Sequence, residues 1–295
     1  MTTRVIDSHQ HFWGDVALPW MSGPFAVLAE PHGPETLRPA LRAAGVDATV
    51  LVQVQASLDE TREFLAIAEA TDFVAGVVGW VPLDAPDVAD TLAELMAGPH
   101  GRWLVGVRHL VQDEPDPDWL GRPAVRHGLR AVAKAGLVYD LLARPPQLPA
   151  CVEIARDFQD LRLVLDHLGK PPIASGAREP WASRISALAA HAQVRCKLSG
   201  MVTEADLTAW QPNDLRPYVE HALDAFGPER CMFGSDWPVC RAAADYGAVK
   251  TALETVLDGV GVTGADREAI FGETAARTYE LAITSGSRST SSSPR

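Results

Sequence analysis

The segment ATVLVQVQ, residues 48–55, carries apolar or β-branched side chains at its first five positions and glutamines at positions 53 and 55. A run without polar alternation predicts a strand buried on both faces, which is typical of parallel sheets covered by helices. Polar side chains come only where the run ends. The segment therefore predicts an inner strand of an α/β fold with a polar carboxyl end.

Seven further runs share this character and start 25 to 44 residues apart: 4–9, 73–81, 104–110, 135–143, 162–169, 194–200 and 231–239. The stretches between them repeat apolar residues every three or four positions, as helices do. These helices are predicted at 34–45, 58–70, 87–97, 122–136, 148–160, 181–192 and 214–227, and a final helical region at 265–282 would close the ring. Ser57 with Glu60 predicts a helix start, and Gly45 predicts a helix end.

Eight strands alternating with helices predict an α/β fold, a (β/α)₈ TIM barrel forming a single domain over residues 1–284. The Ser-rich segment 285–295 is predicted to be a disordered tail. A doubly wound open sheet is the alternative architecture. It is disfavoured because no GxGxxG or P-loop motif follows an early strand.

Composition excludes several classes of partner. The chain has 38 acidic and 26 basic residues, a formal net charge of −12, and no Lys/Arg-rich run. Nucleic acid and anionic membrane surfaces are therefore poor partners. The sequence contains neither a signal-peptide pattern nor an apolar stretch long enough for a membrane span, so we expect a cytoplasmic protein. Its oligomeric state stays open, with a dimer as one option.

The four cysteines form no CxxC pair and no zinc-finger spacing. Because apolar runs surround Cys196 and Cys231, we interpret them as buried free thiols, which a reducing cytoplasm would preserve.

The carboxyl ends of the predicted strands are unusually polar. His9 and His11 lie two residues apart, so they point to one face of the first strand. The other strand ends carry Gln53, Arg108, His109, Asp140, Asp166, His167, Lys170, Lys197, Ser199, Ser235 and Asp236. Burying a polar group without a partner costs roughly 2–7 kcal/mol, so these side chains are expected to meet in one polar pocket, where barrel enzymes hold their active sites.

Individual residues admit more than one role. Asp236 could cap a helix or present a carboxylate to the pocket. Arg108 and Lys197 could serve as counter-ions of Asp140 and Asp236, or could contact a substrate carboxylate or carbonyl. Five other histidines lie in predicted loops or helices, where a surface position is the better interpretation: His32, His100, His127, His191 and His221.

Five segments together resemble the amidohydrolase-2 branch of the amidohydrolase superfamily: VIDSHQHFW (5–13), GVRHLVQDEPDPDWL (106–120), VLDHLGKPPI (164–173), CKLSGM (196–201) and FGPERCMFGSDWPVC (226–240). The resemblance extends over residues 4 to 282. Within this branch the chain is most similar to sugar-lactone lactonases of the L-fuconolactonase and L-rhamnonolactonase type, and to 2-pyrone-4,6-dicarboxylate lactonase. It implies a (β/α)₈ barrel that hydrolyses a lactone ester.

The resemblance also implies roles for single residues. His9 and His11 match the family's first-strand HxH, His167 its sixth-strand histidine, and Asp236 the eighth-strand aspartate that serves as general base toward water. These four could hold one divalent ion, with zinc the expected metal, and a metal-independent site is the alternative. Arg108, His109 and Asp140 stand where larger amidohydrolases carry further ligands, so at most one ion is expected.

The function predicted is a hydrolase opening a small sugar-acid lactone. His167, Lys197 or a bound ion would hold the charge that forms on the carbonyl oxygen. Substrate contacts are expected from Arg108, His109, Gln53, Asp140, Trp237, Trp20 and Trp13, the tryptophans offering stacking surface. Two alternatives are a metal-dependent amidohydrolase or decarboxylase of an aromatic acid, and an inactive barrel that serves as a binding protein.

Overall fold

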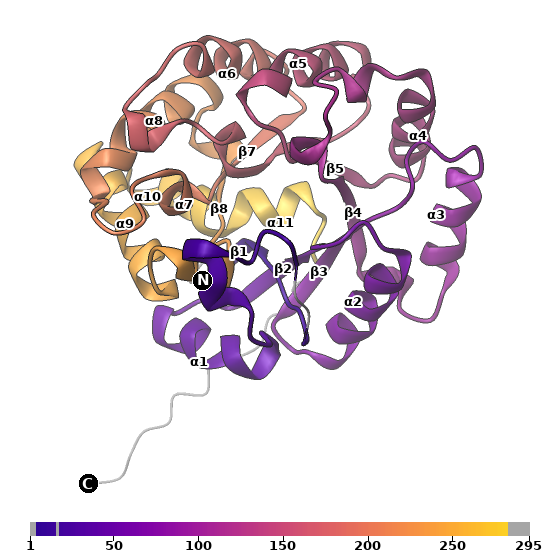
Figure 1. The fold of residues 1–295 in the computed structure, drawn as a ribbon, viewed down its shortest axis with the longest axis horizontal. Helices are drawn as coiled ribbons and strands as arrows, with labels where there is room; N and C mark the ends of the chain where they lie inside the picture. Colours follow the sequence, from indigo (N-terminus) through magenta and orange to yellow (C-terminus); the bar gives the residue numbers. More distant parts are fainter. Residues whose placement is uncertain (1–3, 16–17, 283–295) are drawn as a thin grey trace, which may run out of the picture.

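Eight parallel strands form one sheet in the computed structural model, which describes residues 4–15 and 18–282. Every strand pairs with the next one along the chain, in the order β1 to β8. Their bounds are β1 Ile6–Gln10, β2 Ala48–Val52, β3 Val74–Gly79, β4 Leu104–His109, β5 Val138–Leu141, β6 Leu163–Leu165, β7 Val194–Leu198 and β8 Cys231–Phe233. Strands β2 to β8 lie within the predicted runs and β1 extends one residue past 4–9, so the predicted barrel is confirmed (Figure 1).

The sheet curves until its first and last strands meet. A parallel bridge joins Gln10 to Trp237. The backbone N–H of Asp236 donates to the carbonyl of His9 over 2.8 Å, and that of His11 donates to the carbonyl of Trp237 over 2.7 Å. The segment after β8 therefore lies directly against the end of β1, although more than 220 residues separate them in the chain.

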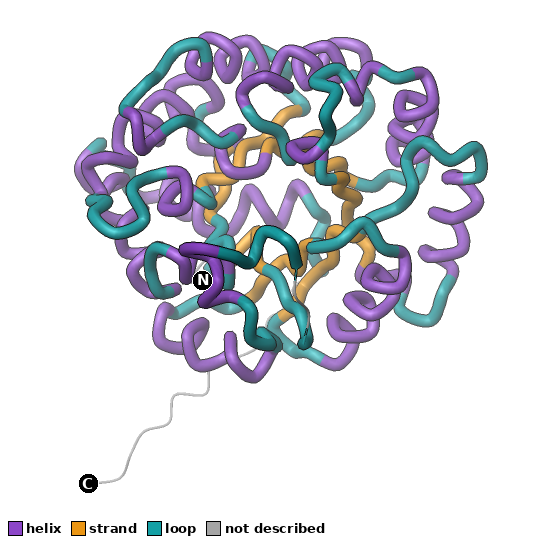
Figure 2. Tube along the Cα trace, viewed as in Figure 1, coloured by secondary structure: helices purple, strands orange, loops and turns teal. Residues whose placement is uncertain are grey.

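Helices surround the sheet as an outer ring (Figure 2). The seven predicted helices are confirmed as α1 Pro34–Ala44, α2 Leu58–Ala70, α3 Val88–Ala97, α4 Pro123–Lys134, α5 Leu148–Asp157, α6 Trp181–Ala189 and α8 Pro212–Phe226. Ser57 Oγ accepts from the N–H of Glu60 at the start of α2, and Gly45 ends α1 in the left-handed region with a φ of 66°. The predicted caps at these positions are confirmed.

Two helices were not predicted, and one of them changes how the ring closes. Short α7 spans Met201–Glu204, and α9 spans Tyr246–Gly259 with Asp245 as its N-cap. Helix α9 packs against α8 and α1 and completes the ring. The expectation that residues 265–282 close it was therefore wrong. The signal for α9 was present, because Val249, Leu253 and Val256 repeat at helical spacing and are buried.

The C-terminal helical segment instead covers the bottom of the barrel, as Figure 1 shows for α11. It consists of α10 Gly264–Glu268, a π-helical turn Ala269–Glu273 and α11 Thr274–Thr278. Gly272 permits the close approach, since a Cβ there would lie 2.0 Å from the carbonyl oxygen of Arg4. Ala275 and Tyr279 pack with strand residues such as Val50 and Val164 inside the barrel.

Other expectations concern the whole chain. None of the helices in residues 4–15 and 18–282 is long and apolar enough to cross a membrane. All four cysteines are buried and unpaired, as predicted. The predicted Ser-rich tail, 285–295, lies outside the described residues.

Candidate functional site

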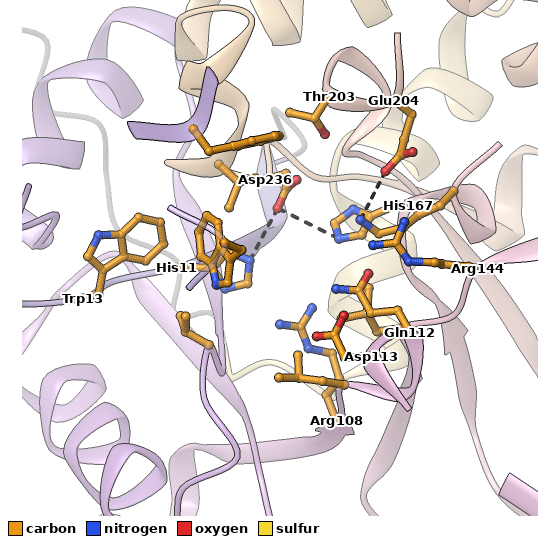
Figure 3. Close-up of a pocket in the computed structure, with 17 residues that line it drawn as sticks. His11, Trp13, Arg108, Gln112, Asp113, Arg144, His167, Thr203, Glu204 and Asp236 are labelled. Atoms are coloured by element: carbon orange, nitrogen blue, oxygen red, sulfur yellow. Dashed lines mark hydrogen bonds and ion pairs between the residues drawn. The ribbon is translucent and has the colours of Figure 1, made fainter. Parts of the chain in front are cut away.

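A cavity opens at the carboxyl ends of the strands, and His11, His167 and Asp236 form its floor (Figure 3). The cavity has an aromatic wall formed by Trp13, Trp20 and Phe25. Val54 and Val239 also line the cavity.

A polar wall lies across the cavity from Trp13: Gln112, Asp113, Arg144, Thr203 and Glu204. Lys170 also lines the cavity and pairs with Glu204 at 3.2 Å. These side chains follow the ends of β4 to β7, so the loops after four strands supply one face of the cavity. An aromatic wall that faces a hydrogen-bonding wall is suited to a small molecule with one apolar and one hydroxylated side.

Asp236 is the centre of the floor. Its Oδ1 lies 3.4 Å from Nε2 of His11, 3.8 Å from Nε2 of His9 and 3.9 Å from Nε2 of His167. Among the described residues, no lysine or arginine pairs with this carboxylate. Burial opposes its ionisation, but His167, His11 and His9 together hold the pKa of Asp236 below its usual range. The floor therefore presents an ionised carboxylate surrounded by three imidazoles.

The backbone explains how Asp236 reaches this place. Its φ is 57°, in the left-handed region that aspartate tolerates better than most residues. The buried carboxylate of Asp7 accepts hydrogen bonds from Ser235 Oγ at 2.5 Å, Ser235 N at 2.8 Å and Tyr246 Oη at 3.0 Å. It also accepts from the N–H of His9 at 3.0 Å. Asp7 therefore holds the two chain segments that carry His9 and Asp236.

Two of the imidazoles have fixed surroundings. Nδ1 of His11 lies 2.8 Å from the carbonyl oxygen of Val52, which can only accept, so Nδ1 carries a proton, and in the neutral ring Nε2 faces the floor with its lone pair. Nδ1 of His167 lies 2.9 Å from Ser199 Oγ. Burial lowers the pKa of His167 to about 4, so this ring is neutral at pH 7.

His9, His11 and Asp236 have the donor set of a metal site. Nε2 of His9 lies 3.1 Å from Nε2 of His11, and Asp236 Oδ1 lies 3.4 and 3.8 Å from these atoms. A tetrahedral ion bound at about 2.0–2.1 Å requires ligand atoms about 3.3–3.4 Å apart. The spacing of these three ligand atoms therefore fits one divalent metal ion.

A second possible set, His9 with Asp166 and His167, suits a metal less well. Asp166 already pairs with two cations, Arg108 Nη1 at 2.9 Å and Lys197 Nζ at 2.9 Å. Its negative charge is thus compensated, whereas that of Asp236 is not. The chemistry of the donors favours the first set.

Several residues predicted for the site lie beneath the floor rather than on the cavity. Lys197 and Asp140 are fully buried and form an ion pair at 2.6 Å. Gln53 is also buried, and its side-chain oxygen accepts from Arg108 Nη2 at 3.0 Å. Arg108 itself lines the cavity, and its Nε has no hydrogen-bond partner among residues 4–15 and 18–282.

The structure places two other predicted residues away from the cavity. His109 stacks on Trp119 at 4.1 Å, and its Nε2 lies 2.7 Å from a carboxylate oxygen of Glu114. Trp237 is buried, with its ring edge to face with those of Phe12 and His32. Trp13 and Trp20, in contrast, line the cavity.

The expected surface position of His32 is wrong, because this residue is only 2% exposed. It packs between the rings of Trp13 and Trp237, and its backbone bridges to Trp13. His127 is exposed, as expected.

Sequence reasoning missed Gln112, Arg144 and Glu204 as cavity residues. Each follows a strand end by three to six positions, which was the available signal. It also missed Tyr279, whose hydroxyl donates to Asp140 from the opposite end of the barrel. Nothing local in the sequence indicates that contact.

Known proteins resemble this chain over almost its full length. Residues 6–281 match the family model described as amidohydrolase. An L-fucono-1,5-lactonase of Burkholderia ambifaria is 41% identical, with 97% of this chain and 98% of that protein covered. An L-fucono-1,5-lactonase of Burkholderia multivorans is 40% identical, with 94% and 96% covered.

A solved structure agrees with these relatives. An amidohydrolase from Burkholderia multivorans with bound zinc superposes with a TM-score of 0.89 at 39% identity, with 94% of this chain and 99% of that chain covered. Sequence, fold and the histidine–aspartate floor all lead to one conclusion: this chain belongs to the amidohydrolase family.

Proposed function

We propose that this protein is a lactonase that hydrolyses the ester bond of a sugar-acid lactone. The observation that carries the proposal is Asp236, an ionised carboxylate on the cavity floor that faces three imidazoles and has no lysine or arginine partner among the described residues. Two relatives at 41% and 40% identity are named L-fucono-1,5-lactonase, which supports a six-membered lactone of a deoxy sugar acid as substrate.

Asp236 is the proposed general base. Hydrolysis requires a water molecule to lose a proton as its oxygen attacks the lactone carbonyl carbon. The Asp236 carboxylate lines the cavity and, with a lowered pKa, is ready to accept that proton at neutral pH. When the bond between the carbonyl carbon and the ring oxygen breaks, the same carboxyl group can return the proton to the ring oxygen, giving the open hydroxy acid.

His167 and Arg108 are proposed to stabilise charge on the carbonyl oxygen. If Ser199 donates to Nδ1 of His167, the ring proton sits on Nε2, on the side of Asp236 and the cavity. Arg108 contributes a positive charge and an Nε–H that has no partner in the described part of the chain. Donors held in place before the reaction stabilise a developing oxyanion without reorganisation.

The site is proposed to hold one divalent metal ion, with zinc as the expected metal. His9, His11 and Asp236 would supply the ligands, with His167 next to them. A bound divalent metal polarises a carbonyl group and lowers the pKa of a water molecule.

The cavity walls are proposed to orient the sugar ring. Trp13 and Trp20 would cover an apolar face or a methyl group, and Gln112, Arg144 and Glu204 would hydrogen-bond to hydroxyl groups on the other side. Oε1 of Gln112 supports this, because it is buried and no described residue donates a hydrogen bond to it.

A panel of lactones tests the proposal. L-fucono-1,5-lactone, L-rhamnono-γ-lactone, their D enantiomers and 2-pyrone-4,6-dicarboxylate would be followed by acid release with a pH indicator, with spontaneous hydrolysis subtracted. We expect kcat/KM to be highest for a deoxy sugar lactone. No acceleration of any lactone by the zinc-supplemented protein, or decarboxylation of an aromatic acid instead, would refute it.

A further inference from the structure

A chain of buried polar side chains lies beneath the cavity floor and ends at His9. Tyr279, Asp140, Lys197 and Asp166 are at most 2% exposed, and none of them lines the cavity. Barrel interiors are usually filled by branched apolar side chains, and a buried ion pair is often no more stable than an apolar replacement. Fold stability alone therefore does not explain why these four buried side chains are polar.

The contacts run upward from the bottom of the barrel. The Tyr279 hydroxyl donates to Asp140 at 2.8 Å, and Asp140 Oδ2 pairs with Lys197 Nζ at 2.6 Å. Lys197 Nζ lies 2.9 Å from Asp166 Oδ1, and the other oxygen of Asp166 pairs with Arg108. The ion pairs with Asp140 and Arg108 hold the side chains of Lys197 and Asp166 beneath the floor.

Both of these groups approach the same ring nitrogen. Nδ1 of His9 lies 3.1 Å from Lys197 Nζ and 3.3 Å from Asp166 Oδ1. A lysine ammonium can only donate, and an ionised carboxylate can only accept. Nδ1 can therefore hydrogen-bond to Lys197 when it is bare or to Asp166 when it carries the proton, but not to both.

The choice at Nδ1 decides what His9 offers to the cavity floor. If Lys197 donates to bare Nδ1, the proton is on Nε2, which can donate over 3.1 Å to the lone pair of His11 Nε2. If Nδ1–H donates to Asp166, Nε2 exposes its lone pair, which can accept from Arg108 Nη1 over 3.3 Å and would serve as a ligand to a bound metal ion. Oδ1 of Asp166 is buried and faces both Lys197 Nζ, at 2.9 Å, and Nδ1 of His9, at 3.3 Å, so its second lone pair can accept from Nδ1–H.

We propose that Lys197 and Asp166 are positioning residues that select the tautomer of His9: Lys197 favours the form with Nε2–H when no metal is bound, and Asp166 favours the form with Nδ1–H that binds metal. The ring stays neutral, since it loses a proton at Nε2 and gains one at Nδ1. Lys197 acts here through His9 and not on substrate. The inference rests on the proposed metal site, but not on the identity of the lactone.

Histidine tautomers can be observed directly in the unaltered protein. Long-range ¹H–¹⁵N spectra of histidine-labelled protein, with His9 assigned from a His9→Gln variant, distinguish a bare from a protonated ring nitrogen. We expect bare Nδ1 in the zinc-free protein and protonated Nδ1 after zinc is added. The same tautomer in both states would overturn the proposal.

Zinc affinity provides a second measurement that does not depend on catalysis. Asp166→Asn retains the shape of the side chain but cannot accept at both positions. With its oxygen kept toward Arg108, the amide NH₂ takes the place of Oδ1, where it faces His9 and can donate only to a bare Nδ1. Loss of such a partner typically lowers metal affinity about 10–100-fold. A chromophoric chelator in competition for zinc measures this change.

Asp140→Asn is the matched control, because it also removes a buried charge beside Lys197 but makes no contact with His9. We expect a zinc affinity within a few-fold of the parent's. Equal losses in both variants, or no zinc binding by the parent, would overturn the inference. If Asp166→Asn does not fold, the tautomer spectra decide. Failure of every lactone with the zinc result intact would refute the proposed function alone.

Discussion

Replacing Asp236 with asparagine tests the proposed base with little change of shape. Asparagine adopts a positive φ as readily as aspartate, and the backbone bonds of residue 236 to His9 and Cys240 do not involve its side chain. The variant should therefore fold, with a melting temperature within a few degrees of the parent's. The side-chain amide of asparagine, unlike the Asp236 carboxylate, cannot accept a proton from water.

The expected loss follows from that single change. General-base catalysis contributes about 10²–10⁴-fold, which corresponds to about 2.7–5.5 kcal/mol of transition-state stabilisation. The amide also places no negative charge beside His11 and His9, so zinc affinity should fall. Turnover must therefore be measured at saturating zinc, with the bound metal quantified, and kcat should then fall by at least about 10²-fold.

Asp245→Asn is the matched control in the same connection after β8. Asp245 caps α9 by accepting from the N–H of Ala248, and asparagine caps a helix equally well. Its kcat and melting temperature should equal the parent's. If Asp236→Asn with zinc bound keeps more than about a tenth of the parent kcat, Asp236 is not the base.

Other perturbations have equally definite outcomes. Elemental analysis after zinc reconstitution should find one ion per chain, and two at full occupancy would contradict the assigned ligands. Gly200→Ala should lower kcat because the added Cβ would lie 2.5 Å from Nδ1 of His167, whereas Gly176→Ala, with φ also positive and no atom within 4 Å, should only reduce stability. Tyr279→Phe should lower the free energy of unfolding in urea by about 1–3 kcal/mol, because buried Asp140 loses a donor, and unchanged stability would contradict this. Ellman's reagent should find no reactive thiol in the native protein and four after denaturation, and fast native labelling would refute their burial.

The sequence alone was sufficient for the barrel and for the composition of its floor. A strand buried on both faces must be apolar along its length, so eight such runs could be counted without coordinates. Parallel strands in a barrel place all their carboxyl ends on one side, so His9, His11, His167 and Asp236 were expected to meet there. Both inferences depend on local pattern and on topology.

Only the tertiary structure decided which polar side chains face the cavity and which lie beneath it. Lys197 and Asp140 also belong to the carboxyl-terminal parts of their strands, but their side chains turn inward to each other at 2.6 Å. Tyr279, the C-cap of α11, reaches Asp140 across 139 residues, and Asp7 binds Ser235 across 228 residues. Such pairings depend on strand register and on how the C-terminal helix enters the barrel, and neither property leaves a periodic signal in the sequence.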